Sequence, residues 1–571
     1  MQEEHFDIVV IGGGHNGTTI AAYLSKCGLS VCIVEARPEC GGGQENTEVR
    51  PGFRIDPHAT YLYGGAAPGF EQLELWRYGF RQVYYPSMAG LVTLDGKAAN
   101  LGGRFSPGLA EQSLAALGVE GGIAGGFLSS MDPGATKELL RALFWTPPHP
   151  PTAEVDPADM PWWQVFRKHM APLWSERLLD MSYVDFLEEF VAWEPLRTFG
   201  AFAAWYCGAH PSWDGMALQS LGGTMLYSYS SGSPRGGMHT YAHAIIRAAL
   251  AKGTRILTNA PVEEIVVHNG RAVGVRLSAD AAFPEKTIWA DKAVISAVDV
   301  QSTFLRLVGN RHLDHGFLQA VSDISLKGGS LWVMSVICRE LPKYHGRDEW
   351  FPTEVYPSCV VAPADSMESF HAQTRDAYSF RRLPQDLSPE HLTMMICAHD
   401  MYDTTRCVEG YHVLSPIYLE CPPPEYDVTG PDGYNRQKAE VTKAALDLLG
   451  EMAPNMRGDN IVDVFVNTPL DSEFRNTGMT GGNWYAARQD SDQWFSNRPL
   501  ADLARYRTPI ESLYMCHQTM HPGGLCLMAV PYNLMHILID DGIAQPGSWW
   551  YPSPWYMADG ASHLAGHGAG L

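Results

Sequence analysis

The chain has 571 residues, of which 45% are hydrophobic, and its formal net charge is −22 at pH 7. This length and composition allow two domains with sizeable cores. Strong acidity without a long basic cluster argues against binding to nucleic acid or to anionic membrane surfaces. No apolar run has the length of a transmembrane segment or the flanks of a secretory leader. We therefore expect a soluble, cytoplasmic protein.

The eleven cysteines are scattered along the sequence without a paired CxxC arrangement. Such usage is typical of a reducing compartment, where cysteine behaves as a small buried hydrophobe. We therefore predict neither a redox disulfide nor a bound metal ion.

The N-terminal segment predicts a buried strand at residues 6–11 that turns directly into a helix over about residues 16–27. Gly12, Gly14 and Gly17 stand at the spacing of a dinucleotide fingerprint. The first glycine permits a tight turn, the second lets the backbone approach a pyrophosphate, and the third lets the helix pack on the strand. The N–H groups at the start of this helix would then face the phosphates.

A second strand, at residues 30–34, ends in Glu35, whose carboxylate would accept hydrogen bonds from the adenosine ribose. The alternative is a tight strand-to-helix turn without a ligand. Strand, glycines, helix, strand and terminal acid in one βαβ unit favour an adenine dinucleotide.

The next clear elements begin after residue 236. Residues 239–252 predict a helix with one apolar face, and residues 255–257 predict a strand. Residues 264–277 predict a hairpin around Asn269 and Gly270, the pair that most readily takes the positive φ angles of a type I′ turn.

Two more buried strands are predicted further along the chain. Residues 293–297 form the first, and Asp299 would cap the helix that follows it. Residues 326–338 form the second, on which Trp332 and Met334 would share one face because they are two residues apart.

A second glycine cluster, Gly41-Gly42-Gly43, stands where an NAD dehydrogenase would begin its next helix. In this feature the chain resembles the phytoene desaturase-like flavoproteins, particularly their pyridine nucleotide-disulfide oxidoreductase domain 2-like branch. The resemblance continues at residues 51–56 (PGFRID), 236–240 (GGMHT), 254–277 and 505–524 (RYRTPIESLYMCHQTMHPGG). It implies FAD as the cofactor. The residues that it assigns to FAD are Gly12, Gly14, Gly17, Glu35, Ala36, Arg37, Gly42, Gly43, Gln44, Val262, Gln518, Leu525 and Tyr532.

The resemblance also implies an α/β fold: a Rossmann-type FAD-binding domain with a discontinuous α+β substrate domain of mixed sheet and helices. Residues 1–75, 225–305 and 505–571 would form the FAD-binding domain. Residues 76–224 and 306–504 would form the substrate-binding domain.

The C-terminal motif departs from the pattern of this family. His517 replaces a usual glycine, Leu525 replaces the third glycine of the HPGGG run, and residues 529–531 replace the later glycine-rich turn. The helix N-terminus can still stabilise negative charge on a reduced flavin, because that needs only backbone N–H groups and a dipole. Larger side chains beside the isoalloxazine would change the pocket, so the resemblance supports FAD binding more than any substrate identity.

Candidate acid–base groups are histidines in segments that this fold should bring near the flavin. In order of preference they are His517, His521, His58 and His239. The alternative for each is a structural hydrogen-bonding histidine.

Five further residues are candidates for substrate binding. They are Tyr61, Tyr229, Arg235, Trp332 and Met334. Arg235 would suit a carboxylate or carbonyl oxygen, and its alternative is a surface or capping arginine. The alternative for Trp332 and Met334 is an ordinary place in the core.

The resemblance implies an FAD-dependent oxidoreductase that dehydrogenates, desaturates or isomerises a hydrophobic organic substrate by hydride transfer to flavin N5. One alternative is an oxygen-dependent, amine-oxidase-like flavin oxidase, and another is a flavin-stabilised binding or assembly protein with little turnover. The sequence contains no second dinucleotide-binding motif, so we do not expect a tightly held NAD(P)H. The substrate stays open, and so does the electron acceptor, with oxygen and a quinone as candidates.

The segment QPGSWWYPSPWY, residues 545–556, holds five aromatic residues that are costly to leave in water as one patch. The first interpretation is docking on the chain's own surface. The second is a contact with another subunit, since aromatic anchors dominate interface energies, and it predicts a homo-oligomer.

Overall fold

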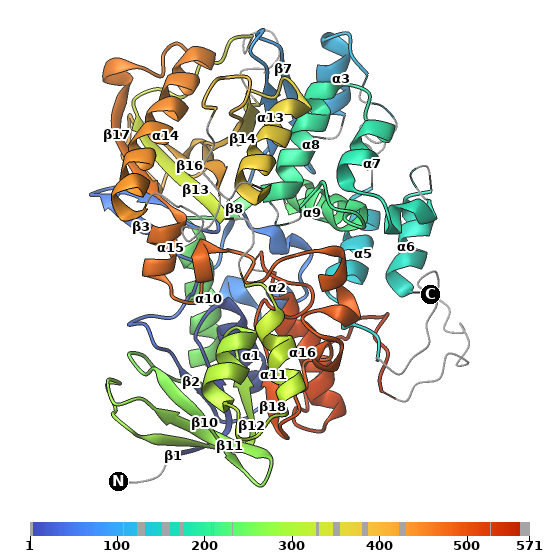
Figure 1. Ribbon diagram of the computed structural model, residues 1–571, viewed down its shortest axis with the longest axis vertical. Coiled ribbons are helices and arrows are strands. Elements are labelled where there is room, and N and C mark those ends of the chain that lie inside the picture. Colours follow the sequence, from blue (N-terminus) through green and yellow to red (C-terminus); the bar gives the residue numbers. More distant parts are fainter. Residues whose placement is uncertain are drawn as a thin grey trace.

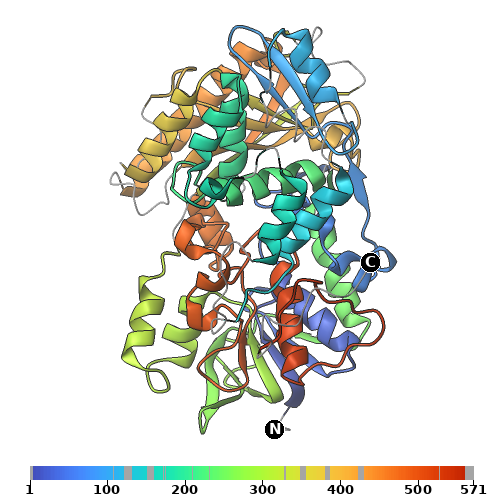
Figure 2. The same ribbon diagram turned by 90° about the vertical axis from the view of Figure 1, so that its right-hand side faces the viewer.

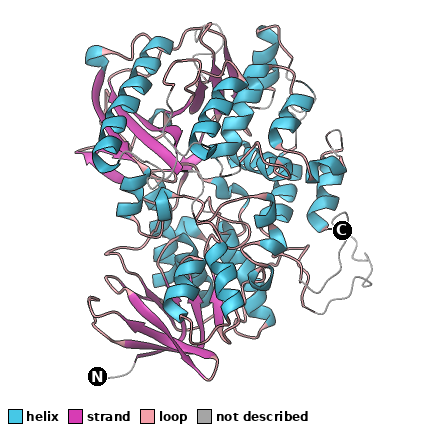
Figure 3. Ribbon diagram, in the orientation of Figure 1, coloured by secondary structure: helices cyan, strands magenta, loops and turns pink. Residues whose placement is uncertain are grey.

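Two seven-stranded sheets lie toward opposite ends of the computed structural model (Figure 1). Helices cover both sheets, and they fill the space between them (Figure 3). The structure describes residues 4–106, 108–120, 122, 132–150, 160–171, 173, 175–206, 208, 210–230, 232–326, 330–346, 355–379, 386–421, 430–525 and 527–559.

The first sheet has the strand order β10-β11-β12-β1-β2-β9, and β18 pairs with the end of β12. Pairing is parallel around β1 and antiparallel from β10 to β12. Three separated parts of the chain therefore build this sheet. Its strands are β1 (Glu4–Ile11), β2 (Val31–Val34), β9 (Arg255–Leu257), β10 (Val262–His268), β11 (Arg271–Leu277), β12 (Thr287–Ser296) and β18 (Leu513–Met515).

The centre of this sheet is buried on both faces. Ile8, Val9 and Val10 of β1 have no exposed surface, which explains why their sequence reads as a continuous apolar run. On one side α1 (His15–Lys26) packs beside α10 (Met238–Leu250) and α16 (Ala529–Asp540). The predicted βαβ unit is thus present, with boundaries within a residue or two of the expectation.

Two backbone predictions can be checked in this sheet. A Cβ on Gly17 would lie 2.0 Å from the carbonyl oxygen of Gly12, so only glycine lets α1 approach β1 this closely. Asn269 and Gly270 both have positive φ, 52° and 80°, as the type I′ turn requires. Both predictions are confirmed.

The second sheet has the order β17-β13-β16-β15-β14-β6-β7 and is antiparallel except between β14 and β6. Every residue of β13 is buried, because helices cover both faces. Its strands are β6 (Ala89–Val92), β7 (Ala98–Gly102), β13 (Ser330–Cys338), β14 (Cys359–Ala362), β15 (Met394–Cys397), β16 (His412–Cys421) and β17 (Ile461–Asn467).

One face of the second sheet packs on α14 (Gly430–Met452), and the other packs on a helical layer that includes α8 and α9 (Figure 2). The remaining helices are α2 (Gly69–Gln72), α3 (Leu109–Ala116), α5 (Pro133–Phe144), α6 (Pro161–His169), α7 (Tyr183–Phe190), α8 (Glu194–Tyr206), α9 (Ala217–Ser230), α11 (His315–Asp323), α13 (Met367–Thr374) and α15 (Pro469–Arg475). Two small two-stranded sheets complete the fold. One is the hairpin of β3 (Thr47–Arg50) with β4 (Phe53–Ile55), and the other pairs the distant strands β5 (Gln82–Tyr84) and β8 (Gly232–Pro234).

The predicted α/β fold class is confirmed by this arrangement of a Rossmann-like sheet and a mixed sheet with helices. The exact domain boundaries stay a prediction. In the described part of the chain, no helix combines the length and apolar character needed to cross a bilayer. No group of three or more His, Cys, Asp or Glu side chains among these residues is arranged to hold a metal ion.

The aromatic C-terminal segment packs on the chain itself. Trp549 stacks on Tyr23 of α1 at 6.1 Å between ring centroids, and Lys26 lies over the same indole at 4.9 Å. Trp550 contacts Tyr532 of α16 at 5.1 Å. These contacts agree with the first interpretation of the segment, and whether the chain forms oligomers stays a prediction.

Candidate active site

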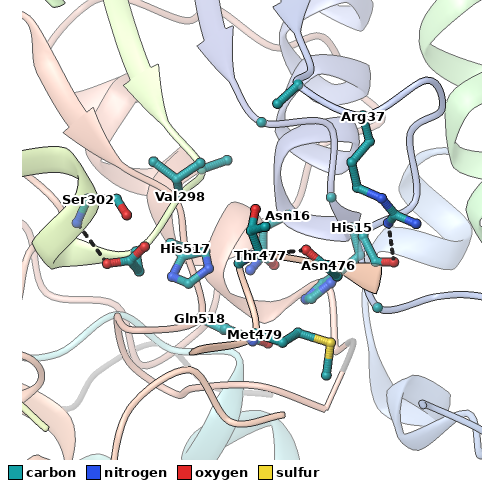
Figure 4. Close-up of a pocket in the computed structure, with 18 of the residues that line it drawn as sticks. His15, Asn16, Arg37, Val298, Ser302, Asn476, Thr477, Met479, His517 and Gln518 are labelled. Carbon is teal, nitrogen blue, oxygen red and sulfur yellow. Dashed lines mark hydrogen bonds between the residues drawn. The ribbon is translucent and has the colours of Figure 1, made fainter. Parts of the chain in front are cut away.

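A cavity of about 560 Å³ opens where the parallel strands β1, β2 and β12 end. This edge is where open α/β sheets bind their ligands. The cavity also reaches Tyr418 of β16, so residues of both sheets line it. Figure 4 shows part of it, with Arg37 and His517 on opposite sides and with His15 and Asn16 between them.

Glu35 is held in place at the end of β2. Its carboxylate accepts hydrogen bonds from the backbone N–H of Gly13, at 2.6 Å, and from that of Arg37, at 2.8 Å. The side chain is buried and lines the cavity. A carboxylate fixed in this way can still accept hydrogen bonds from ribose hydroxyls at its remaining lone pairs.

The two glycine turns face each other across the start of α1. A Cβ built on Gly42 would lie 3.0 Å from Cα of Gly14, and one built on Gly14 would lie 3.9 Å from Cα of Gly42. Gly42 also has a φ of +59°, which disfavours other residues. Because neither glycine has a side chain, the space between the two turns stays empty, and the N-terminus of α1 is open to an anion such as a pyrophosphate. Added side chains would fill this cradle.

Arg37 joins the second glycine turn to the acidic residue that follows it. Its guanidinium donates to the carbonyl oxygen of Gly42 at 3.3 Å and to the carboxylate of Glu45. Val262, at the start of β10, lines the same part of the cavity. Asp299 accepts a hydrogen bond from the backbone N–H of Ser302 at 2.8 Å, as predicted for a capping residue (Figure 4). This half of the cavity fits an adenine dinucleotide.

The other half of the cavity is aromatic. Tyr63, Tyr206, Tyr418, Trp484 and Tyr485 line it, and they come from separate segments of the chain. The hydroxyl of Tyr418 donates to the carbonyl oxygen of His58 at 3.0 Å, which fixes this ring in the wall. Such a surface suits an apolar or cyclic organic molecule.

Two histidines line the cavity between these halves with lowered pKa values. Burial lowers the pKa of His517 to about 4, although the nearby carboxylate of Asp299 opposes this shift. Burial and the charge of His517 lower the pKa of His15 to about 4. Both imidazoles are therefore neutral at pH 7, and each can accept a proton or a hydrogen bond.

His58 is the second predicted histidine in the cavity wall, and it is paired. Its Nδ1 lies 3.1 Å from Oε2 of Glu45, and its side chain is only 1% exposed. The ring meets Trp484 edge-on at 5.7 Å. Burial alone would raise the pKa of Glu45, but the hydrogen bond and charge of His58, together with Arg37, lower it to about 2. The site therefore holds a carboxylate–imidazole pair.

The other two candidate histidines do not line the cavity. His521 is fully buried and stacks on Phe495 at 4.9 Å, and burial lowers its pKa to about 3. His239 lies on α10, where its Nδ1 is 3.2 Å from the carbonyl oxygen of Gln44. Their positions favour the structural alternative.

Most residues assigned to the cofactor line the cavity: Gly12, Gly14, Glu35, Ala36, Arg37, Gly42, Gly43, Val262, Gln518 and Leu525. Three do not. Gly17 packs against β1, and Tyr532 donates to the carbonyl oxygen of Tyr551 in the C-terminal segment. The side chain of Gln44 is fully buried beside the second glycine turn, where its amide has no hydrogen-bond partner.

None of the residues predicted to bind substrate lines this cavity. Trp332 and Met334 do share one face of β13, but that face packs on α14, so both belong to the core. Arg235 is exposed, in agreement with its surface alternative. Tyr61 is buried behind the wall and donates to Sγ of Cys397 at 3.2 Å. Tyr229 lines a second, separate cavity.

Sequence reasoning missed several residues of the site. His15 and Asn16 lie within the glycine fingerprint at the start of α1, so the motif itself could have predicted that they line the cavity. Glu45 follows the second glycine cluster without a motif of its own. The segment around Thr477 and the aromatic lining carry no local pattern, since only the tertiary fold brings them together.

Solved flavin-type enzymes share this fold. The chain superposes on putrescine oxidase with a TM-score of 0.56 at 15% identity, over 95% of this chain and all of that one. Cyclohexylamine oxidase from Brevibacterium oxydans gives 0.52 at 15% identity, over 94% and 99% of the two chains. Residues 220–309 match the family described as GMC oxidoreductase, and residues 10–73 match that of NAD(P)-binding Rossmann-like domains. Fold and site together define a flavin-type oxidoreductase.

Relatives extend over almost the whole chain. It is 24% identical to pyridine nucleotide-disulfide oxidoreductase domain-containing protein 2 of Rattus norvegicus, over 94% of each protein. It is 22% identical to a limonene dehydrogenase subunit of Castellaniella defragrans, again over 94% of each. The chain is thus a homologue of these oxidoreductases, and the predicted resemblance to the domain 2-like branch is confirmed.

Proposed function

We propose that the chain is an FAD-dependent oxidoreductase that dehydrogenates, desaturates or isomerises an apolar organic molecule. The observation that carries this proposal is the single cavity that joins a dinucleotide cradle to an aromatic chamber. The relative named as a subunit of limonene dehydrogenase supports an apolar, cyclic substrate class. FAD, when bound, supplies hydride acceptance at N5.

The chain's own residues have three tasks in this function. Gly14, Gly42 and the N-terminus of α1 receive the pyrophosphate, and Glu35 receives the ribose hydroxyls. Aromatic side chains, including Tyr418, exclude water and hold the apolar molecule. A histidine of the wall takes the proton that leaves the substrate.

His58 and His517 are the residues that we propose for this proton. Nδ1 of His58 lies 3.1 Å from Oε2 of Glu45, which favours a proton on that nitrogen, so Nε2 is the nitrogen that we propose exchanges the substrate proton. That Nε2 is buried, and no other residue in the described part of the chain forms a hydrogen bond with it. His517 is neutral at pH 7 because burial lowers its pKa to about 4. Each imidazole can offer a nitrogen to this proton, and the lowered pKa makes His517 a weak base.

Anaerobic mixing of the FAD-loaded protein with limonene, apolar alcohols, cyclic ketones and polyenes tests the proposal. One class should bleach the visible absorbance of the oxidised flavin, because hydride transfer reduces it. If none bleaches it although FAD is needed for folding, a binding or assembly role replaces the proposal. Rapid reoxidation of the reduced protein by air would instead identify an oxygen-dependent oxidase.

A further inference from the structure

A second cavity of about 490 Å³ lies inside the helical layer. Helices α3, α5, α7, α8 and α9 contribute to its wall. Most of the lining is apolar, with Phe186, Leu187, Phe199 and Met225 as examples. Among the described residues, it shares no lining residue with the main cavity.

This volume is not a packing defect. Protein interiors are packed like organic crystals and leave few voids larger than a water molecule. Cavities that bind small molecules measure roughly 300–1,000 Å³ and are mostly apolar, and the second cavity falls in that range. Its size and lining therefore fit an apolar molecule of the size of the proposed substrate.

The second cavity reaches the surface at one end. Ser228, Asp132 and Pro133 line it and are exposed. At the same rim the guanidinium of Arg104 lies over the ring of Tyr229, 4.6 Å from its centroid. An apolar molecule can therefore enter from solvent between α5 and α9.

At its other end the second cavity is separated from the main one by tyrosine rings. Tyr227 of α9 lines the second cavity, and Tyr63 lines the main cavity. Their ring centroids are 6.3 Å apart, and Tyr61 meets Tyr227 edge-on at 5.1 Å. The wall between the two cavities is thus one pair of rings thick at Tyr63 and Tyr227.

Among the described residues, no aromatic side chain that lines the main cavity is exposed. Its exposed lining residues, within the described part of the chain, are Ala36, Arg306, Thr477 and Gly478. Ala36 follows Glu35 in the dinucleotide half, and Thr477 and Gly478 belong to the segment 476–479 that lines the cavity. Tyr206, Tyr418 and the other aromatic lining residues are buried or half-buried. A dinucleotide bound at Glu35 would lie beside Ala36 and would restrict access to the main cavity from that side.

We propose that the second cavity is an antechamber for the apolar substrate, and that the Tyr63–Tyr227 pair is the gate to the main cavity. The antechamber takes a hydrophobic molecule without charge, because its lining offers large apolar area and few polar groups. Rotation of the two rings joins the cavities. This inference rests on the proposed function for its substrate class.

Ser228→Trp tests the route, because it places an indole at the exposed mouth of the antechamber. With limonene as the probe, the second-order rate constant of anaerobic flavin reduction should fall at least tenfold. The rate at saturation, the flavin spectrum and the rate of reduction by dithionite should stay unchanged. Leu470→Trp adds the same bulk at a site that is 46% exposed and lines neither cavity, and it should behave as the wild type. An unchanged second-order constant in Ser228→Trp would overturn the proposal.

A crystal structure of the holoenzyme soaked in limonene tests the antechamber without turnover. Limonene between α7 and α9 is the expected result. An empty second cavity at saturating limonene would overturn the inference, even if limonene bleaches the flavin. Limonene bound there without any flavin reduction would support the antechamber and count against limonene as substrate in the proposed function.

Discussion

The two halves of the main cavity are built by different means. The dinucleotide half is mostly backbone: two glycine turns, the start of α1 and one carboxylate that two N–H groups hold. The aromatic half is made of side chains from separate segments, such as Tyr206 and Trp484. A backbone site needs particular residues at fixed spacing, whereas a side-chain surface tolerates change as long as its volume is kept. The dinucleotide half can therefore be predicted from the sequence, whereas the aromatic half can change between relatives and so alter which substrate binds.

The largest effect should follow from filling the cradle. A Cβ at Gly14 meets only Cα of Gly42, at 3.9 Å, so the backbone there accepts a side chain, and we expect Gly14→Val to fold while its side chain occupies the space that the pyrophosphate needs. We expect purified Gly14→Val to have native far-UV circular dichroism and to lack the flavin absorbance. Gly316→Ala is the control, because Gly316 is exposed in α11 and lines neither cavity. Full flavin occupancy in Gly14→Val would refute the cradle.

The next effect concerns the boundary between the two halves. The rate of anaerobic flavin reduction should be measured in His58→Ala and in His517→Ala and compared with that of the wild type. Replacing the histidine that acts as the base should lower this rate roughly 10²–10⁴-fold. Glu45→Gln removes the charge that faces His58 and should lower the same rate less if His58 is the base. The flavin spectrum should not change in any variant.

The exposed His345→Ala is the control for these histidine variants. Wild-type rates in both His58→Ala and His517→Ala would remove histidine from the mechanism. Loss of rate in His345→Ala would show that the assay reports stability instead.

Acid should destabilise the packing that supports the cavity. His521 and His536 are fully buried, and burial lowers their pKa values from 6.5 to about 3. Each is neutral in the folded chain but protonated in the unfolded chain below pH 6.5, so unfolding takes up protons as pH falls toward 3. Each should cost about 1.4 kcal/mol of stability per pH unit in that window.

Denaturant titrations at pH 7.5, 6.0 and 5.0 measure this slope. Stability should be nearly constant above pH 7 and should fall below 6.5. His521→Gln should reduce the slope of unfolding free energy against pH, because about one proton fewer is taken up on unfolding. A stability that does not change between pH 7 and 5 would contradict these two pKa values.

The smallest effect should be on assembly. The aromatic C-terminal segment contacts α1 and α16 through Trp549 and Trp550, so truncation after Ala544 should not change the sedimentation coefficient beyond the lost mass. The truncated chain should keep FAD but unfold at a lower temperature, because aromatic contacts are lost. A smaller assembly that retains FAD would show that this segment also forms an interface between copies of the chain.

The elements that sequence predicted best are those specified by neighbouring residues. The fingerprint, the Asn269-Gly270 turn and the apolar strand β1 each carry their own physical requirement. The shared face of Trp332 and Met334 was also predictable from a period of two. Which side of the sheet that face meets was not, because every residue of β13 is buried and no polar alternation marks one side.

Contacts between distant segments explain the remaining errors. His58 meets Glu45 because the chain folds back between them, where Asn46 donates to Asp56 at 3.1 Å. Nothing in the spacing of these residues shows that contact. His521 belongs to a family motif, yet it stacks on Phe495, and no local pattern brings these two rings together. Aromatic lining from separate segments can be recognised only in the folded chain.

The central claim is that one cavity holds both FAD and the apolar substrate. A crystal structure of the protein purified with its cofactor tests this claim directly. We expect FAD with its pyrophosphate between Gly14 and Gly42, its ribose on Glu35, and its isoalloxazine facing the aromatic half near Tyr418. A different nucleotide in the cradle, or an isoalloxazine that does not reach the aromatic half, would contradict the claim.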